Sequence, residues 1–251
     1  MVAEIFFCLA LAPVVLILWY IYKKDVHKEP TGQLAKSFFL GVLISIPVCI
    51  LETIMILILP KEEDLYNSFI CLFIYTFFGV GIIEELFKWI VVRFANYNNN
   101  HFDETYDAIV YSVFVSLGFA AFENLVYVFG DFLVNGALES FITIVIRFVT
   151  AIPGHAFFGI CMGYFLSKAK ISQTKFEKGK EKKFLFFSIL IPTLLHTLYD
   201  FLIITQSFLM VIVWFIVVIL FYVFAIIMVR KASKNNVHYN NAELLNDKMP
   251  Q

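Results

Sequence analysis

The feature that most constrains this chain is a series of long apolar segments, each long enough to cross a lipid bilayer. We place them at residues 3–22, 34–59, 68–93, 107–130, 138–166, 184–204 and 208–229. A transmembrane helix needs about 20 mostly apolar residues, whereas a membrane β-barrel alternates apolar and polar residues in segments of about 10 residues. Because the apolar runs are continuous, the pattern predicts an all-α, polytopic bundle of about seven membrane spans.

Composition supports this interpretation and excludes several soluble classes of protein. Hydrophobic residues make up 61% of the 251 residues and charged residues 16%, against about 25% charged residues in an ordinary soluble domain. The net charge is −1 and the lysines gather at the ends of apolar runs, which argues against nucleic-acid binding. The four cysteines lie far apart within apolar runs, so no thiolate zinc site and no redox motif is predicted.

The basic residues predict the orientation of the chain in the membrane. Most of them lie on one side of the predicted spans: Lys23, Lys24, Lys28, Lys36, Arg93, Lys168, Lys170, Lys175, Lys178, Lys180, Lys182, Lys183, Arg230, Lys231, Lys234 and Lys248. Lys61 lies on the other side, and Lys88 and Arg147 fall within spans. Since basic residues gather on the cytosolic side, we expect the N-terminus outside and the C-terminus in the cytosol.

The change from apolar to polar composition near residue 230 divides the chain into two parts. Residues 1–230 are expected to form one integral membrane domain, and the short connection at Gln206 predicts a tight hairpin between the last two spans. The polar, Asn-rich residues 231–251 are expected to form a disordered cytosolic tail.

Ionisable side chains within the spans carry most of the functional information. A charge at mid-bilayer costs about 2.5–3.5 kcal/mol on insertion scales, so each one calls for a reason. Four successive spans carry such groups or their polar neighbours: Glu84, Glu85, Lys88, Glu123, Asn124, His155, His196 and Asp200. Glu84 shares a helix face with Lys88, whereas Glu85 is expected to point about 100° away from it. We expect these groups to converge on one buried polar pocket.

Structural roles stay open for some of the charged residues. Glu84 and Lys88 could form a structural ion pair, and His155, which follows Pro153-Gly154, could bond a carbonyl that the proline frees. Glu52 and Arg147 fall in the outer half of the membrane and could pair with each other.

A carboxylate beside a histidine in a dry pocket suits general-base catalysis on water. A glutamate of span 68–93 would activate water against a peptide carbonyl, and His196 would donate a hydrogen bond to the oxyanion while Asp200 orients its ring. A zinc site is the alternative chemistry, although the sequence has no His-Glu-x-x-His motif. A proton- or ion-coupled transporter that uses these groups as a relay is the main alternative function. A lipid- or cation-binding structural protein is the third.

Four short motifs within residues 13–203 resemble those of the PrsW intramembrane proteases. In chain order they are Lys24-Asp25-x-x-x-Glu29-Pro30, Glu84-Glu85-x-x-Lys88, Phe119-x-x-x-Glu123-Asn124 and His196-x-x-x-Asp200. The resemblance implies a multi-pass protease of the bacterial cytoplasmic membrane. That family is similar to the CAAX-type and bacteriocin-processing membrane proteases, which are regarded as metal-independent glutamate proteases. Their second motif carries a histidine where this chain has Glu123.

The resemblance and the residue chemistry together assign roles. The predicted catalytic residues are Glu84, Glu85, Glu123 and His196, with Glu84 or Glu85 as the base and no metal or other cofactor. The predicted supporting residues are Lys88, Asn124, His155 and Asp200. The family implies a substrate, a single-pass membrane anti-sigma factor, whose first cleavage leads to sigma-factor activation under envelope or antimicrobial-peptide stress. The other implied partners are membrane lipids, with no nucleic acid, and no oligomeric state follows from the sequence.

Overall fold

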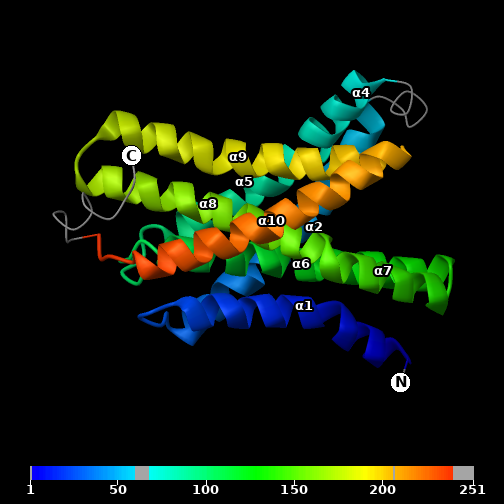
Figure 1. Ribbon diagram of the computed structural model, residues 1–251, viewed down its shortest axis with the longest axis horizontal. Helices are drawn as coiled ribbons and strands as arrows, with labels where there is room; N and C mark the ends of the chain where they lie inside the picture. Colours follow the sequence, from blue (N-terminus) through cyan, green and yellow to red (C-terminus); the bar gives the residue numbers. More distant parts are fainter. Residues whose placement is uncertain (1, 60–67, 206, 240–251) are drawn as a thin grey trace.

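The computed structural model of the protein describes residues 2–59, 68–205 and 207–239, and the elements of this part are all helical (Figure 1). In chain order they are α1 (Val2–Lys24), α2 (Thr31–Ile58), α4 (Phe69–Ile74), η1 (Tyr75–Gly81), α5 (Ile82–Val91), η2 (Val92–Asn96), α6 (Asp107–Val134), α7 (Ala137–Val149), α8 (Ala151–Thr174), α9 (Lys178–Ile204) and α10 (Phe208–Lys234).

Seven helical stretches of the described chain are long and apolar enough to cross a membrane, which confirms the predicted all-α bundle of seven spans. Two of these stretches are composite. The third joins α4, η1, α5 and η2, and the fifth joins α7 and α8. The predicted hairpin at Gln206 lies outside the described residues, between α9 and α10.

The outer surface of the bundle is apolar, as a lipid-facing surface must be. Helix α10 exposes large aliphatic side chains, among them Ile216, Ile219 and Val223. In a soluble protein so large an exposed apolar surface would promote aggregation. In a bilayer the lipid tails cover it, so the chain is a multi-pass membrane protein.

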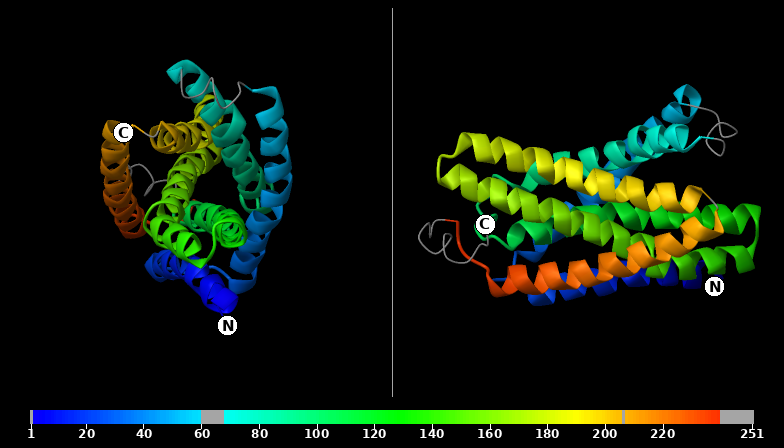
Figure 2. Two further views of the ribbon diagram at one scale, coloured as in Figure 1. Left: turned by 90° about the vertical axis from the view of Figure 1, so that its right-hand side faces the viewer. Right: turned by 45° about the horizontal axis from the view of Figure 1, so that its top comes forward.

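Helices α6 and α8 lie at the centre of the bundle (Figure 2, left). Small residues allow this close packing. A Cβ atom on Gly118 of α6 would lie 2.0 Å from the carbonyl oxygen of Phe38 on α2, and one on Gly163 of α8 would lie 2.4 Å from that of Ala108 on α6. Helices in membranes commonly approach through such glycines because backbone contacts replace the hydrophobic effect.

The predicted fifth span, 138–166, is not one continuous helix. It breaks at Thr150, which has φ −128° and ψ −69°, and then resumes as α8. Pro153 lacks an N–H group, so it cannot donate to the carbonyl oxygen of Val149. The Tyr222 hydroxyl of α10 donates to that oxygen instead, at 2.9 Å. The carbonyl that Pro153 frees is thus bonded by Tyr222, not by His155.

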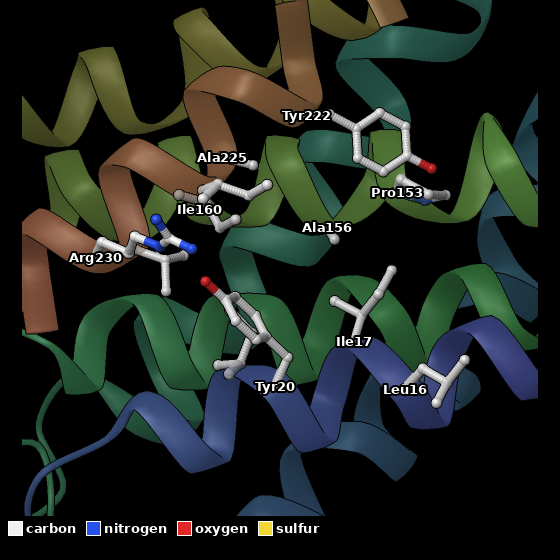
Figure 3. Close-up of a pocket in the computed structure, with 12 residues that line it drawn as sticks. Leu16, Ile17, Tyr20, Pro153, Ala156, Ile160, Tyr222, Ala225 and Arg230 are labelled. Carbon is white, nitrogen blue, oxygen red and sulfur yellow. The ribbon is translucent and has the colours of Figure 1, made fainter. Parts of the chain in front are cut away.

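An apolar pocket of about 310 Å³ lies between α1, α8 and α10 (Figure 3). Leu16 and Ile17 of α1 and Ala156 and Ile160 of α8 line it, with Arg230 at one end. Of the predicted site residues, none lines this pocket.

Most of the lysines lie in, or on helix ends close to, the chain segments that meet at one end of the bundle (Figures 1 and 2). These segments are residues 25–30, 97–106 and 175–177, together with the chain after α10, and we call this end the Lys-rich end. The predicted tail begins at residue 231, but α10 continues to Lys234, and both Val237 and Tyr239 are buried. Residues 240–251 lie outside the described part.

Candidate active site

The ammonium group of Lys88 lies at the centre of a buried polar cluster. Its Nζ donates to Glu84 Oε2 and to Glu85 Oε1, both at 2.8 Å, and lies 3.1 Å from Nδ1 of His155. The Lys88 side chain has no exposed surface, and Nζ lies 4.3 Å from the centre of the Phe119 ring. A buried ammonium requires several such partners, because it has lost its hydration.

Both glutamates therefore reach the same ammonium, and the prediction that Glu85 points away from Glu84 is wrong. The two side chains start about 100° apart on α5. The three flexible side chains bend toward a common point because each carboxylate gains from contact with the one buried cation.

The third span changes its helical form directly before these residues. The segment η1 is a π-helix, and a regular α-helix resumes at Ile82. A π-turn inserts extra residues into a helix and rotates the following side chains relative to those before it. Gly81 ends this segment against α9, where a Cβ atom would lie 2.6 Å from the Thr197 hydroxyl. These features bring Glu84 and Glu85 close to α9.

His196 of α9 contacts the glutamate pair directly. Its Nδ1 lies 3.0 Å from Glu85 Oε1 and 3.8 Å from Glu84 Oε2, while its Nε2 lies 3.5 Å from Asp200 Oδ2. Phe158 stacks on the imidazole ring with 4.8 Å between ring centres. Asp200 was expected to orient this ring, but the shorter contact is with Glu85, so Glu85 holds the ring and Nε2 keeps the looser contact.

His155 of α8 connects the lysine to the second glutamate motif. While Nδ1 faces Lys88, its Nε2 lies 2.8 Å from Oε2 of Glu123 on α6. The sequence supports only a secondary role for His155, yet the structure places it between two charged groups and 5.3 Å from the ring of His196. Its position after Pro153-Gly154 carries no signal of this contact, because the partners lie on other helices.

Arg147 completes the network at the α7–α8 break. Its Nη2 lies 3.1 Å from Glu123 Oε2, and its Nε donates to Asn124 Oδ1 at 2.7 Å. Arg147 therefore contacts the second motif, whereas the sequence suggested Glu52 as its partner. Asn124 also donates to the carbonyl oxygen of Ala10, which attaches α1 to the cluster's outer edge.

The first motif lies elsewhere, at the Lys-rich end. Glu29 accepts a hydrogen bond from the Tyr111 hydroxyl, and burial raises the pKa of its carboxyl above the ordinary value. Asp25 accepts a hydrogen bond from the backbone N–H of Glu29 at 3.3 Å. The predicted catalytic and supporting residues, in contrast, all belong to the one mid-bundle network.

Comparisons with known proteins identify the family of the chain. Residues 29–228 match the family model described as "PrsW family intramembrane metalloprotease". The chain is 38% identical over 193 residues to "Protease PrsW" of Oceanobacillus iheyensis, covering 77% of this chain and 80% of that protein. The protein of the same name from Bacillus subtilis is 36% identical over 198 residues, which are 78% of this chain and 82% of that protein.

The chain belongs to the PrsW family of intramembrane proteases. "Protease PrsW" of Clostridioides difficile is a further relative, 35% identical over 201 residues, covering 80% of this chain and 79% of that protein. No solved structure matches the chain.

The description of the PrsW family model as a metalloprotease raises the question of a metal ion. Among the described residues, Glu84, Glu85, His155 and His196 offer ligand atoms within 4.8 Å of one another. However, Lys88 Nζ already contacts three of these four residues. A divalent cation at the same point would face an adjacent, fully buried ammonium, and like charges repel strongly in a medium of low dielectric. With Lys88 in place, the residues do not fit a metal ion.

Proposed function

We propose that the protein is a metal-independent peptidase of the bacterial cytoplasmic membrane that hydrolyses a peptide bond of a membrane-embedded substrate. The observation that carries this proposal is the buried network of Glu84, Glu85, Lys88, His155 and His196 within a chain of the PrsW family. Such a network offers a general base, a counter-ion and hydrogen-bond donors without a nucleophilic serine or cysteine.

Glu84 is the better candidate for the general base. Glu85 is fully buried and its Oε1 contacts both Lys88 and His196, so that carboxylate positions its neighbours. Glu84 is 4% exposed, and among the described residues it contacts only Lys88 within hydrogen-bond distance. In the proposed reaction Glu84 takes a proton from water as the water oxygen attacks the peptide carbonyl carbon. The same proton then passes to the leaving nitrogen as the C–N bond breaks.

His196 is the proposed donor to the oxyanion that forms on the carbonyl oxygen. Glu85 holds Nδ1 of the ring. Because the contact between Nε2 and Asp200 is long, the Nε2–H is available to donate a hydrogen bond to the substrate. His155 and Glu123 form the opposite side of the site, with Arg147 and Asn124 fixing Glu123 and the α6–α7 pair. A fixed donor of this kind typically contributes about 10²–10³-fold in kcat.

For the substrate we propose a single-pass membrane anti-sigma factor, cleaved first by this protein so that a sigma factor is released under envelope or antimicrobial-peptide stress. This step rests on the resemblance to the PrsW proteases. A substrate helix would reach the buried cluster from within the bilayer.

The test compares cells that make equal amounts of wild-type protein, Glu84→Gln or Glu85→Gln. New N-termini of membrane proteins are mapped by mass spectrometry under envelope stress, and candidate cleavages are repeated with purified components. We expect a new terminus in a single-pass protein with wild type only. Retention of wild-type cleavage by both variants would refute the catalytic assignment. An unchanged set of termini, together with a solute flux that depends on Glu84, would favour the transporter that the sequence left open.

Independence from metal is tested on the purified protein with a chelator. We expect cleavage to continue at the wild-type rate after exhaustive chelation at a temperature well below unfolding. Complete loss that zinc restores would instead show that cleavage depends on a bound metal ion.

A further inference from the structure

A second group of ionisable side chains lies at the Lys-rich end, where three connections meet. His27 belongs to the connection between α1 and α2, Glu104 to that between η2 and α6, and His238 to the chain after α10. An isolated antiparallel β-bridge pairs Glu104 with His238, and the backbone N–H of Tyr239 donates to the carbonyl of Asp103 at 2.8 Å. Backbone contacts therefore hold the chain after α10 in place.

Both imidazoles point at the same carboxylate oxygen. His27 Nδ1 lies 2.7 Å from Glu104 Oε1, and His238 Nε2 lies 2.9 Å from it. The two rings lie 5.9 Å apart. The Glu104 side chain is 3% exposed, and its second oxygen accepts a hydrogen bond from the side chain of Asn236. Three potential ligand atoms thus converge on one point with the carboxylate held in position.

Two more carboxyl groups lie beside Glu104. The carboxylates of Asp25 and Asp107 are buried beside Glu104, with ligand atoms of all three within 4.8 Å of one another. Asp25 Oδ1 and Asp107 Oδ1 are buried and accept no hydrogen bond from the described residues. Lys28 lies nearby, but its Nζ donates to the backbone carbonyls of Tyr22 and Asp25. Buried carboxylate oxygens that accept no hydrogen bond are costly, and a bound cation is one way to offset that cost.

We propose that His27, Glu104 and His238 bind a zinc ion at the Lys-rich end, separate from the catalytic cluster. Two imidazoles and one carboxylate form a set of three protein ligands that zinc accepts, with water in the fourth position. Imidazole ligands favour zinc over calcium or magnesium, which prefer oxygen ligands.

The side chains that contact these three ligands also suit a zinc site. When Nε2 of His238 binds metal, its Nδ1–H faces Asp103, whose Oδ2 lies 3.7 Å away. A carboxylate in this position fixes the tautomer and the orientation of a metal-binding histidine. Asn236 holds Glu104 from the other side and also bonds the backbone N–H of Tyr106 at 2.9 Å.

The zinc site would be a feature of this chain beyond the matched family segment. That segment spans residues 29–228, so both histidines lie outside it. The ion would join the α1–α2 connection, which carries Asp25 and Glu29, to the chain after α10.

The experiment measures zinc bound by the purified full-length protein, carrying a tag without histidine, in detergent micelles or nanodiscs. Wild type is compared with His27→Ala/His238→Ala, with Glu104→Gln, and with the catalytic variant Glu84→Gln/Glu85→Gln. His101→Ala is the matched control, because His101 is an exposed histidine of the connection that carries Glu104. His27 and His238 are 70% and 47% exposed, so their replacement leaves the core intact.

After dialysis against micromolar zinc, we expect the double histidine variant to hold one zinc ion fewer per chain than wild type. His101→Ala and the catalytic variant should match wild type, and Glu104→Gln should bind at least tenfold more weakly. Zinc should also raise the midpoint temperature of unfolding of wild type but not of the double histidine variant.

Equal zinc content in wild type and the double histidine variant would overturn the proposal. So would the absence of bound zinc in wild type at micromolar concentration. Because the readout is metal content, either result leaves the proposed peptidase activity to its own test.

Discussion

At the scale of single residues, the decisive feature is that one ammonium group balances a pair of buried carboxylates. Lys88 has no exposed surface and contacts Glu84 and Glu85 at 2.8 Å. Breaking a buried ion pair by removing one partner costs about 3–5 kcal/mol, because the remaining charge is left unpaired in a medium of low dielectric. The lysine therefore contributes to the fold as well as to the arrangement of the site.

We expect Lys88→Met to lower the free energy of unfolding by about 3–5 kcal/mol and to abolish cleavage. The triple variant Lys88→Met/Glu84→Gln/Glu85→Gln should recover most of this stability, since no unpaired charge remains, yet stay inactive. Unfolding in micelles followed by tryptophan fluorescence checks the first point, and peptide cleavage the second. A Lys88→Met protein as stable as wild type would mean that Lys88 is not the counter-ion of the carboxylates.

Residue chemistry in the sequence predicts most of this site but not its connections. Ionisable groups within apolar runs can be recognised because their burial is costly, which identifies Glu84, Glu85, Glu123, His196 and their neighbours. Which groups touch depends on how helices pack. His155 of α8 contacts Lys88 of α5 and Glu123 of α6. Helical spacing along one span cannot predict contacts between different helices.

At the scale of helices, long apolar runs predict the seven spans, whereas the irregular segments are not predictable from them. The π-helix η1 is a local change of helical form, and at the break at Thr150 a neighbouring helix supplies a replacement contact. Tyr222 of α10 bonds the carbonyl of Val149 beside the break. Hydropathy averages over a whole span, so it does not register a local change of hydrogen-bond pattern.

The contact between η1 and α9 depends on Gly81. A Cβ atom there would lie 2.6 Å from the Thr197 hydroxyl, which is too close, so Gly81→Ala must shift α5 away from α9. This shift would separate Glu85 from His196. We expect peptide cleavage to fall by about 10- to 100-fold, because misplacement of about 1 Å can cost on that order, while the protein still inserts and folds.

The matched control is Gly130→Ala on α6, where an added Cβ meets nothing within 4 Å and activity should stay at the wild-type level. The double variant Gly81→Ala/Thr197→Ala removes the Thr197 hydroxyl and should recover part of the lost cleavage. Full activity of Gly81→Ala alone would show that the spacing of these helices does not control the site.

At the scale of the whole molecule, the distribution of lysines predicts which end of the bundle faces the cytosol. The connections 25–30 and 175–177 and the chain after α10 lie at one end of the bundle (Figure 1), as the alternation of seven spans requires. The proposed zinc site, the Asp25–Glu29 motif and most of the lysines share this end. If the positive-inside rule holds for this chain, all of them face the cytosol.

The orientation is tested with a reporter enzyme that is active only outside the cytosol, fused at three points of the chain. Fusions after Phe176 and in the tail should be inactive, because both points belong to the Lys-rich end, whereas a fusion after Gln206 should be active. Active fusions at both Lys-rich points, with an inactive one at Gln206, would invert the predicted orientation but leave the bundle intact. Opposite results after Phe176 and in the tail would contradict the bundle itself, since an even number of spans, formed by α9 and α10, separates these two points.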